Sequence, residues 1–317
     1  MGKVADRVRN PRVALLAGLV FALTPAFASQ PTLPASDPPD EIVVTGERLT
    51  NEEIRQRAVE FVRGTGVANG ETPVARWVEP VCVRVTGIRE DQAQRVKTTM
   101  LAIADAARIP AARGDCRHNI LVGFTADATA LINEIHRLAP SRFVELSRGD
   151  REDLLEGREP VRWWYTTDYR SPHGMGRTSV SLATESSSSG GLPITAEATR
   201  HYNSSMISTQ SVRFLTTATV VIDANGVRSQ SLEAIGAYAA LVAFAEIQDL
   251  EFAPRGSILS LFESPSAPEE LADQDMAFLR SLYRLPLDRQ AMRHRGLLVG
   301  GMVDATREGA SEGRNPR

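Results

Sequence analysis

The sequence lacks the short motifs that mark the common hydrolases and nucleotide-binding proteins. It has no His-Glu-x-x-His run and no Ser-x-x-Lys pair. Its one Gly-x-Ser-x-Gly match, residues 309–313, lies in the C-terminal tail and not at a strand-to-helix elbow. It also has no glycine-rich phosphate loop with a lysine, and no Gly-x-Gly-x-x-Gly turn behind a strand. These absences argue against a conventional zinc peptidase, a serine hydrolase of these types, and a P-loop or dinucleotide-binding enzyme.

Long apolar runs are also scarce, and the clearest one lies at the N-terminus. Residues 13–28 are mostly apolar, follow a basic start and end in Ala26-Phe27-Ala28, a small-x-small cleavage site. A bilayer needs about 20 apolar residues, so a membrane anchor is the weaker alternative. We therefore interpret residues 1–28 as a cleaved signal peptide. The mature protein is expected to be periplasmic or secreted, with no transmembrane segment.

Cysteine is limited to Cys82 and Cys116. In an exported chain two cysteines are expected to pair, because the compartment is oxidising. The alternative is a catalytic thiol, but neither cysteine lies in a pattern that marks an activated nucleophile. The sequence thus predicts a Cys82–Cys116 disulfide.

Lysine is equally rare, since Lys3 and Lys97 are the only two and nearly every other base is arginine. The formal net charge is −3, and acidic and basic residues are interspersed. Because the sequence shows no cluster of basic residues, the protein is not expected to bind nucleic acid.

The chain divides into segments of different composition. Residues 29–72 are expected to form a flexible N-terminal linker with a short helix at 50–63, which begins in a Thr50/Glu53 capping box. Residues 73–304 are expected to form a single domain. It contains a mobile Ser/Gly-rich insertion at about 171–212, and a disordered tail covers 305–317.

Within this domain, a strand at 79–87, a helix at 90–109 and a strand at 118–125 predict a parallel β-α-β unit. Further strands are expected at 159–171 and 213–226. The helix expected at 231–247 is apolar all round, which predicts that it is the most buried helix. Leu241, Val242 and Phe244 are its expected core members. The fold class is therefore α+β.

The clearest candidate for ligand binding is the aromatic group Trp163, Trp164 and Tyr165, with Arg162 beside it. Alternation along a strand places Trp163 and Tyr165 on one face and Trp164 on the other. An exposed ring next to an arginine could stack on a sugar or a peptide. The alternative is that these rings pack in the core.

The five histidines, which are His118, His136, His173, His201 and His294, are scattered along the chain. A metal site needs convergent ligands, so we predict no metal and no cofactor. Glu233, Asp168, His173 and His201 are the candidates for an unrecognised hydrolase site.

The order of elements in residues 213–285 resembles the catalytic half of a metzincin-type zinc peptidase that has lost its ligands. Ser257-Ile258-Leu259 stands where that family has a Ser-Ile-Met turn, and Leu282-Tyr283 ends the closing helix as in the family. The resemblance implies a zincin-like mixed sheet with a buried central helix and C-terminal helices. It extends to secreted proteobacterial proteins of unknown function that share the Trp77-x-x-Pro80 strand start. Ordinary α+β packing without peptidase ancestry is the alternative.

Residues 41–49, Glu-Ile-Val-Val-Thr-Gly-Glu-Arg-Leu, are similar to the segment behind the signal peptide of many TonB-dependent receptors. The chain lacks the many alternating strands of their barrels. The likeness thus points only to the Gram-negative envelope, and a short exposed strand is the alternative.

Together these features predict an exported cell-envelope protein that binds a protein, a peptide or a glycan without catalysis, through an inactive metallopeptidase-like cleft. The alternative is a hydrolase with an unrecognised active site.

Overall fold

A four-stranded mixed sheet organises the part of the chain that the computed structural model describes, which is residues 49–312 apart from 171–208, 210, 249, 251–252 and 265. The strands are β1 (Val83–Thr86), β2 (Ile120–Thr125), β3 (Val161–Arg170) and β4 (Val212–Asp223), and their order is β1-β2-β4-β3. β1, β2 and β4 are parallel, whereas β3 runs antiparallel to β4 at one edge. The predicted β-α-β unit and the α+β class are therefore confirmed.

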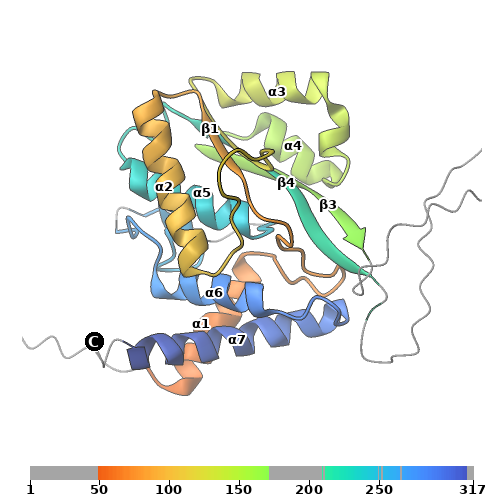
Figure 1. The fold of residues 1–317 in the computed structure, drawn as a ribbon, viewed down its shortest axis with the longest axis vertical. Helices are drawn as coiled ribbons and strands as arrows, with labels where there is room; N and C mark the ends of the chain where they lie inside the picture. Colours follow the sequence, from red (N-terminus) through yellow and green to blue (C-terminus); the bar gives the residue numbers. More distant parts are fainter. Residues whose placement is uncertain are drawn as a thin grey trace, which may run out of the picture. The chain divides into compact units, whose positions relative to one another are not determined.

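Seven α-helices accompany the sheet within the described residues (Figure 1). They are α1 (Asn51–Gly64), α2 (Glu90–Ala106), α3 (Ala128–Leu138), α4 (Arg148–Glu156), α5 (Leu232–Phe244), α6 (Asp273–Arg284) and α7 (Ala291–Glu312). Two short 3-10 helices complete the set, η1 (Pro140–Phe143) and η2 (Ile258–Ser260). No described helix combines the length and the apolar character that crossing a bilayer requires.

Side-chain caps explain where several helices begin. Thr50, Asp127, Ser147 and Ser231 each accept a hydrogen bond from a backbone N–H in the first turn of the helix that follows. At α1 the predicted capping box is present, because Glu53 also accepts a hydrogen bond from the Thr50 backbone N–H. Such caps satisfy donors that the helix itself leaves unpaired.

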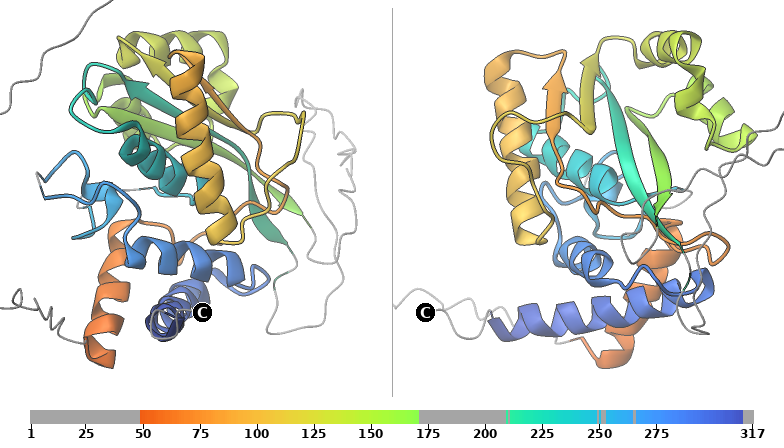
Figure 2. Two further views of the ribbon diagram at one scale, coloured as in Figure 1. Left: turned by 60° about the vertical axis from the view of Figure 1, so that its left-hand side comes forward. Right: turned by 45° about the vertical axis from the view of Figure 1, so that its right-hand side comes forward.

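The helices form layers on the two faces of the sheet. Figure 2 shows α2 and α5 on one face, and α3 and α4 on the other. Helices α6 and α7 and the N-terminal helix α1 pack together beside one end of the sheet (Figure 1). Of these helices, α5 is the most deeply enclosed, because every residue from Ala234 to Phe244 is buried. The prediction for this helix is confirmed.

A glycine lets α2 and α5 approach closely. A Cβ atom at Gly236 of α5 would lie 3.1 Å from the Thr99 Cβ of α2. This is closer than ordinary van der Waals contact, so a larger residue would push the two helices apart. The two helices, which both contact the sheet, thereby pack directly against each other.

Two predicted boundaries are wrong. The expected linker helix belongs to the folded unit, because Phe61 of α1 is fully buried and its ring centroid lies 4.9 Å from that of Phe278. The predicted start of the disordered tail, residue 305, is too early in the sequence. Helix α7 continues to Glu312, and its residues Val303 and Ala305 are buried. In both cases the apolar face of a terminal helix packs on another helix, which local composition does not reveal. Most of the expected insertion lies outside the described residues, and Val212 already belongs to β4.

Candidate functional site

The carboxyl end of α5 is held by hydrogen bonds from aromatic side chains. Tyr165 Oη donates to the Val242 carbonyl at 2.6 Å, Trp77 Nε1 to the Ala243 carbonyl at 2.8 Å, and Tyr283 Oη to the Phe244 carbonyl at 2.8 Å. The last carbonyls of a helix have no partner within it, and water cannot reach them here. The aromatic side chains therefore donate hydrogen bonds to the carbonyl groups at the buried end of α5.

The four predicted binding residues are divided between the two faces of the sheet. Trp164 is buried on the α3–α4 face, where its ring stacks on Phe143 with centroids 5.0 Å apart. Tyr165 is buried on the α5 face, and the half-buried Trp163 donates from Nε1 to the Ile247 carbonyl at 2.9 Å. Arg162 is 6% exposed and donates to the Leu154 carbonyl and to Thr129 Oγ1. The polar atoms of Trp163 and Tyr165 and the terminal nitrogens of Arg162 thus bond inside the protein, whereas Arg162 Nε is buried without a partner among the described residues.

Aromatic rings also pack around Tyr238 of α5. The Tyr238 ring lies between Trp163 and Phe262, with centroid distances of 6.1 and 5.1 Å. Burial raises the pKa of Tyr238 well above its usual value, so this hydroxyl stays protonated. The packed rings of Trp163, Tyr238 and Phe262 therefore make the surroundings of α5 on this side apolar.

Of the four candidates for an unrecognised hydrolase, the structure describes Glu233 on α5 and Asp168 on β3. Glu233 opens the helix, but it is exposed and forms a two-bond pair with Arg95 of α2 at 3.0 and 2.9 Å. Hydrogen bonds from its own backbone and from Arg95 lower the pKa of Glu233. Asp168 lies on β3, where its carboxylate accepts from the Tyr169 N–H. His173 and His201 lie outside the described residues.

Two buried acids have structural partners. Asp275 accepts from the backbone N–H groups of Ile258 and Ala272 at 2.9 and 3.0 Å, which joins η2 to the start of α6. Burial raises the pKa of Asp275 to about 6. Glu246, just beyond α5, is held by both terminal nitrogens of Arg213 at 2.5 and 2.6 Å. Burial nevertheless raises the pKa of Glu246.

Sequence reasoning missed the Arg213–Glu246 pair. The two residues are 33 positions apart, and each carries an ordinary local context. A charged residue inside the expected strand at 213–226 and another at the end of an apolar helix were the only signals. A charged side chain is almost never buried without a partner. A charged residue in a strand or helix that is expected to be buried therefore predicts an oppositely charged partner.

A pocket of about 680 Å³ lies between α1 and the segment before η2. Its lining carries three arginines and one acid. The residues are Arg57, Glu60, Phe61, Arg63, Gly64, Ala253, Pro254, Arg255, Gly256 and Gln274. None of its three arginines forms an ion pair with the residues that the structure describes. Three guanidinium groups and one carboxylate, that of Glu60, therefore surround this hollow, which gives it an excess of positive charge.

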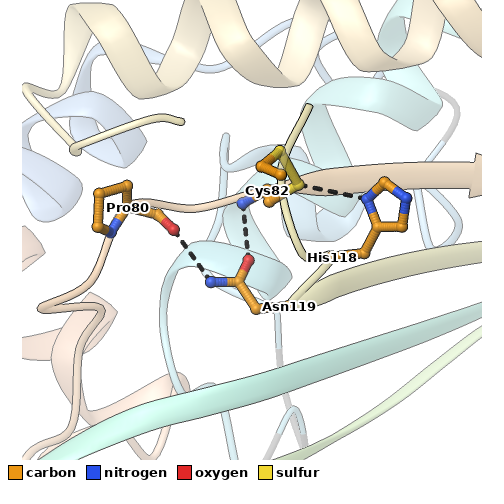
Figure 3. The surroundings of a disulfide bond; sticks show 5 residues. Pro80, Cys82, His118 and Asn119 are labelled. Atoms are coloured by element: carbon orange, nitrogen blue, oxygen red, sulfur yellow. Dashed lines mark hydrogen bonds between the residues drawn. A yellow bond between two sulfur atoms is a disulfide. The ribbon is translucent and has the colours of Figure 1, made fainter. Parts of the chain in front are cut away.

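The predicted disulfide is present. Cys82 precedes β1 and Cys116 precedes β2, and their Cα atoms are 6.1 Å apart. Figure 3 shows His118 beside the bond, with Nδ1 at 3.3 Å from the Cys82 Sγ atom. Asn119 accepts from the Cys82 N–H at 2.7 Å and donates to the Pro80 carbonyl at 3.1 Å (Figure 3). These residues, Pro80, Cys82, Cys116, His118 and Asn119, form what we call the disulfide corner. It connects the start of β1 to the start of β2.

Comparisons with family models, with curated proteins and with solved structures gave no match to this chain.

Proposed function

We propose that the protein is an exported, non-catalytic binding protein of the cell envelope that has a zincin-like plan. The main support is the environment of α5. This helix is buried all round, and the ring of its own Tyr238 packs against the rings of Trp163 and Phe262. Zinc catalysis needs three protein ligands and an open position for water, and packed rings supply neither.

The order of elements supports the zincin-like part of the proposal. An antiparallel edge strand, β3, precedes β4 and the buried helix α5. The chain then makes the η2 turn and closes with α6. This is the order of parts that the sequence shares with the metzincin-type plan. The Cys82–Cys116 disulfide supports export, because such bonds persist in oxidising compartments.

The arginine pocket suits a peptide that carries carboxylates. Arg57 and Arg63 belong to α1, and Arg255 comes from the opposite side of the pocket. Gln274 Nε2 donates to the Arg255 carbonyl at 2.7 Å and so holds the backbone of that segment against α6. Guanidinium groups bind carboxylates through two parallel hydrogen bonds. An acidic side chain or a peptide carboxyl terminus would therefore be the group that this pocket holds.

Fluorescence anisotropy with labelled acidic peptides tests the binding function. We expect a Glu/Asp-containing hexapeptide to bind, and its Gln/Asn analogue to bind at least about tenfold more weakly, since hydrogen bonds to charged groups are the stronger ones. The triple variant Arg57→Gln/Arg63→Gln/Arg255→Gln should lose this preference. Arg55→Gln, an exposed arginine of α1 that does not line the pocket, serves as the matched control.

Equal binding of the acidic and neutral peptides, or an unchanged affinity of the triple variant, would contradict a role of this pocket. Export is tested separately: mass spectrometry of the envelope fraction should find a mature chain that starts at Ser29. A third assay incubates the purified protein with peptides in the presence of zinc, and we expect no cleavage. Metal-dependent cleavage that disappears in His173→Ala or His201→Ala would instead favour a hydrolase.

A further inference from the structure

The disulfide corner holds three groups that ligate soft metal ions. Within the described residues, Cys82, Cys116 and His118 form a group whose candidate ligand atoms all lie within 4.8 Å of one another. Cys82 is buried, Cys116 is half-buried and His118 is exposed. In the oxidised protein the sulfur atoms are bonded to each other, so they are not available as thiolates.

The distance between Cys82 Sγ and His118 Nδ1 is close to the one that a tetrahedral ion needs. Zn–S bonds of about 2.3 Å and Zn–N bonds of about 2.0–2.1 Å imply a sulfur–nitrogen separation of roughly 3.6 Å. His118 Nδ1 already lies 3.3 Å from Cys82 Sγ. The two sulfur atoms would have to separate to roughly 3.8 Å. The histidine is therefore in place, and the disulfide is the part that must open.

The backbone of this corner is fixed by groups other than the disulfide. Asn119 bonds both to the Cys82 N–H and to the Pro80 carbonyl (Figure 3). The N–H groups of Asn119 and Ile120 also donate to the Cys82 carbonyl, each at 3.2 Å. These bonds do not involve sulfur, so they can hold Cys82 next to His118 after reduction. Outer hydrogen bonds of this kind orient metal ligands.

The burial of the two sulfurs also suggests how the bond opens. A thiolate of an external dithiol attacks Sγ of Cys116, the more exposed cysteine, and forms a mixed disulfide while Cys82 leaves as a thiolate. His118, 3.3 Å from that sulfur, can donate a hydrogen bond to the departing thiolate. The second thiol of the reductant then releases Cys116. The dithiol ends as a cyclic disulfide, and the protein gains two electrons and two protons.

We propose that the reduced protein binds one Zn²⁺ ion through the sulfur atoms of Cys82 and Cys116 and Nδ1 of His118. Both thiols release their protons on binding, and the fourth position is open to water, as in other sites with three protein ligands. The disulfide thus acts as a redox gate: the oxidised corner is a covalent staple, and the reduced corner is a zinc site. This inference goes beyond the proposed binding function and does not depend on it.

Titration with Co²⁺, a spectroscopic substitute for zinc, tests the site. The full mature protein, reduced with a metal-compatible phosphine, should bind one Co²⁺ with a thiolate-to-cobalt band in the near ultraviolet and tetrahedral bands in the visible. The oxidised protein should show neither. His118→Ala should weaken binding at least about tenfold, because loss of an outer partner alone commonly costs that much. His136→Ala, a half-exposed histidine on α3, should bind like the wild type.

Thermal unfolding of the reduced proteins provides a second measurement. Zinc should raise the Tm of the reduced wild type and of His136→Ala, and have little effect on reduced His118→Ala. Should reduction unfold the chain, zinc should restore its far-ultraviolet circular dichroism. The proposal is overturned if the reduced protein binds no Co²⁺, if His118→Ala binds it as tightly as the wild type, or if zinc neither raises the Tm nor restores the fold.

Discussion

The two faces of the sheet bury their side chains in different ways. On one face, α5 is enclosed on all sides and shares a large apolar cluster with α2, η2 and α6. On the other, the buried cluster contains six residues, which are Ala128, Ile132, Phe143, Leu154, Trp164 and Val221. Helices α3 and α4 bury one stripe only and keep their outer sides in solvent. The first face therefore carries most of the buried apolar area, and with it most of the hydrophobic stabilisation.

The difference extends to how the helix backbones find partners. On the α3–α4 face, polar side chains at exposed helix starts are sufficient, as Asp127 and Ser147 show. The end of α5 is out of reach of water, so tyrosine and tryptophan donors from three other segments complete its hydrogen bonds. Enclosing a helix on all sides thus requires large amphipathic side chains nearby. The aromatic residues that looked like a ligand surface serve this purpose in part.

The largest expected effect is a difference in stability between core substitutions on the two faces of the sheet. Phe244→Ala should lower the free energy of unfolding by about 3–5 kcal/mol, because the ring is fully buried and cannot be replaced by solvent. Leu154→Ala in the small cluster should cost about 2 kcal/mol, since a site near the surface can collapse around the smaller residue. Urea unfolding of both variants measures the difference. Equal losses would show that the two clusters are packed with similar rigidity.

The next effect concerns a charge beneath the large cluster. The pKa of Asp275 is about 6 in the folded protein, above its ordinary value of 3.8. The unfolded chain loses this proton first, so the contribution of Asp275 is most favourable below about pH 4 and declines as the pH rises to about 6. A shift of this size corresponds to roughly 2–3 kcal/mol.

Urea unfolding between these pH values measures this contribution. The stability of the wild type relative to Asp275→Asn should fall across this window and level off above it. The exposed Asp273→Asn on the same helix turn provides the control. A difference between wild type and Asp275→Asn that does not change with pH would contradict the assignment.

The smallest expected effect tests the hydrogen bonds at the end of α5. Tyr165 Oη donates to the Val242 carbonyl and accepts from the Ile247 N–H at 3.2 Å. Tyr165→Phe keeps the ring but leaves these buried groups unpaired, so we expect a loss of about 1–3 kcal/mol. Tyr169→Phe, on the same strand with a 44% exposed side chain, should change stability very little. If both variants unfold like the wild type, the hydroxyl of Tyr165 does not stabilise α5.

Local pattern was sufficient for the elements that depend on neighbours in sequence. The capping box at Thr50, the strand–helix–strand order and the apolar circumference of residues 231–247 were all legible, because turn chemistry and periodicity act within a few residues. The Cys82–Cys116 bond also followed from composition, since two cysteines in one chain have one possible pairing.

Contacts between segments that are distant in the sequence could not be predicted from local patterns. The arginine pocket joins α1 to Arg255, and nothing in either stretch indicates the other. The same holds for the burial of α1 on α6 and for His118, whose place beside the sulfur of Cys82 depends on the pairing of β1 with β2. Such features could not be predicted from the sequence because packing brings them together, and no local propensity encodes it.

The sequence by itself determined the α+β class, the disulfide and the buried character of α5, because composition and periodicity are properties of the chain. Only the tertiary structure decided what the polar atoms do. The sheet aims Trp163 and Tyr165 at the end of α5 and Trp164 at the opposite cluster, and it pairs Arg213 with Glu246. Side-chain period specifies which residues share a face, but the partner across that face exists only once the layers have packed.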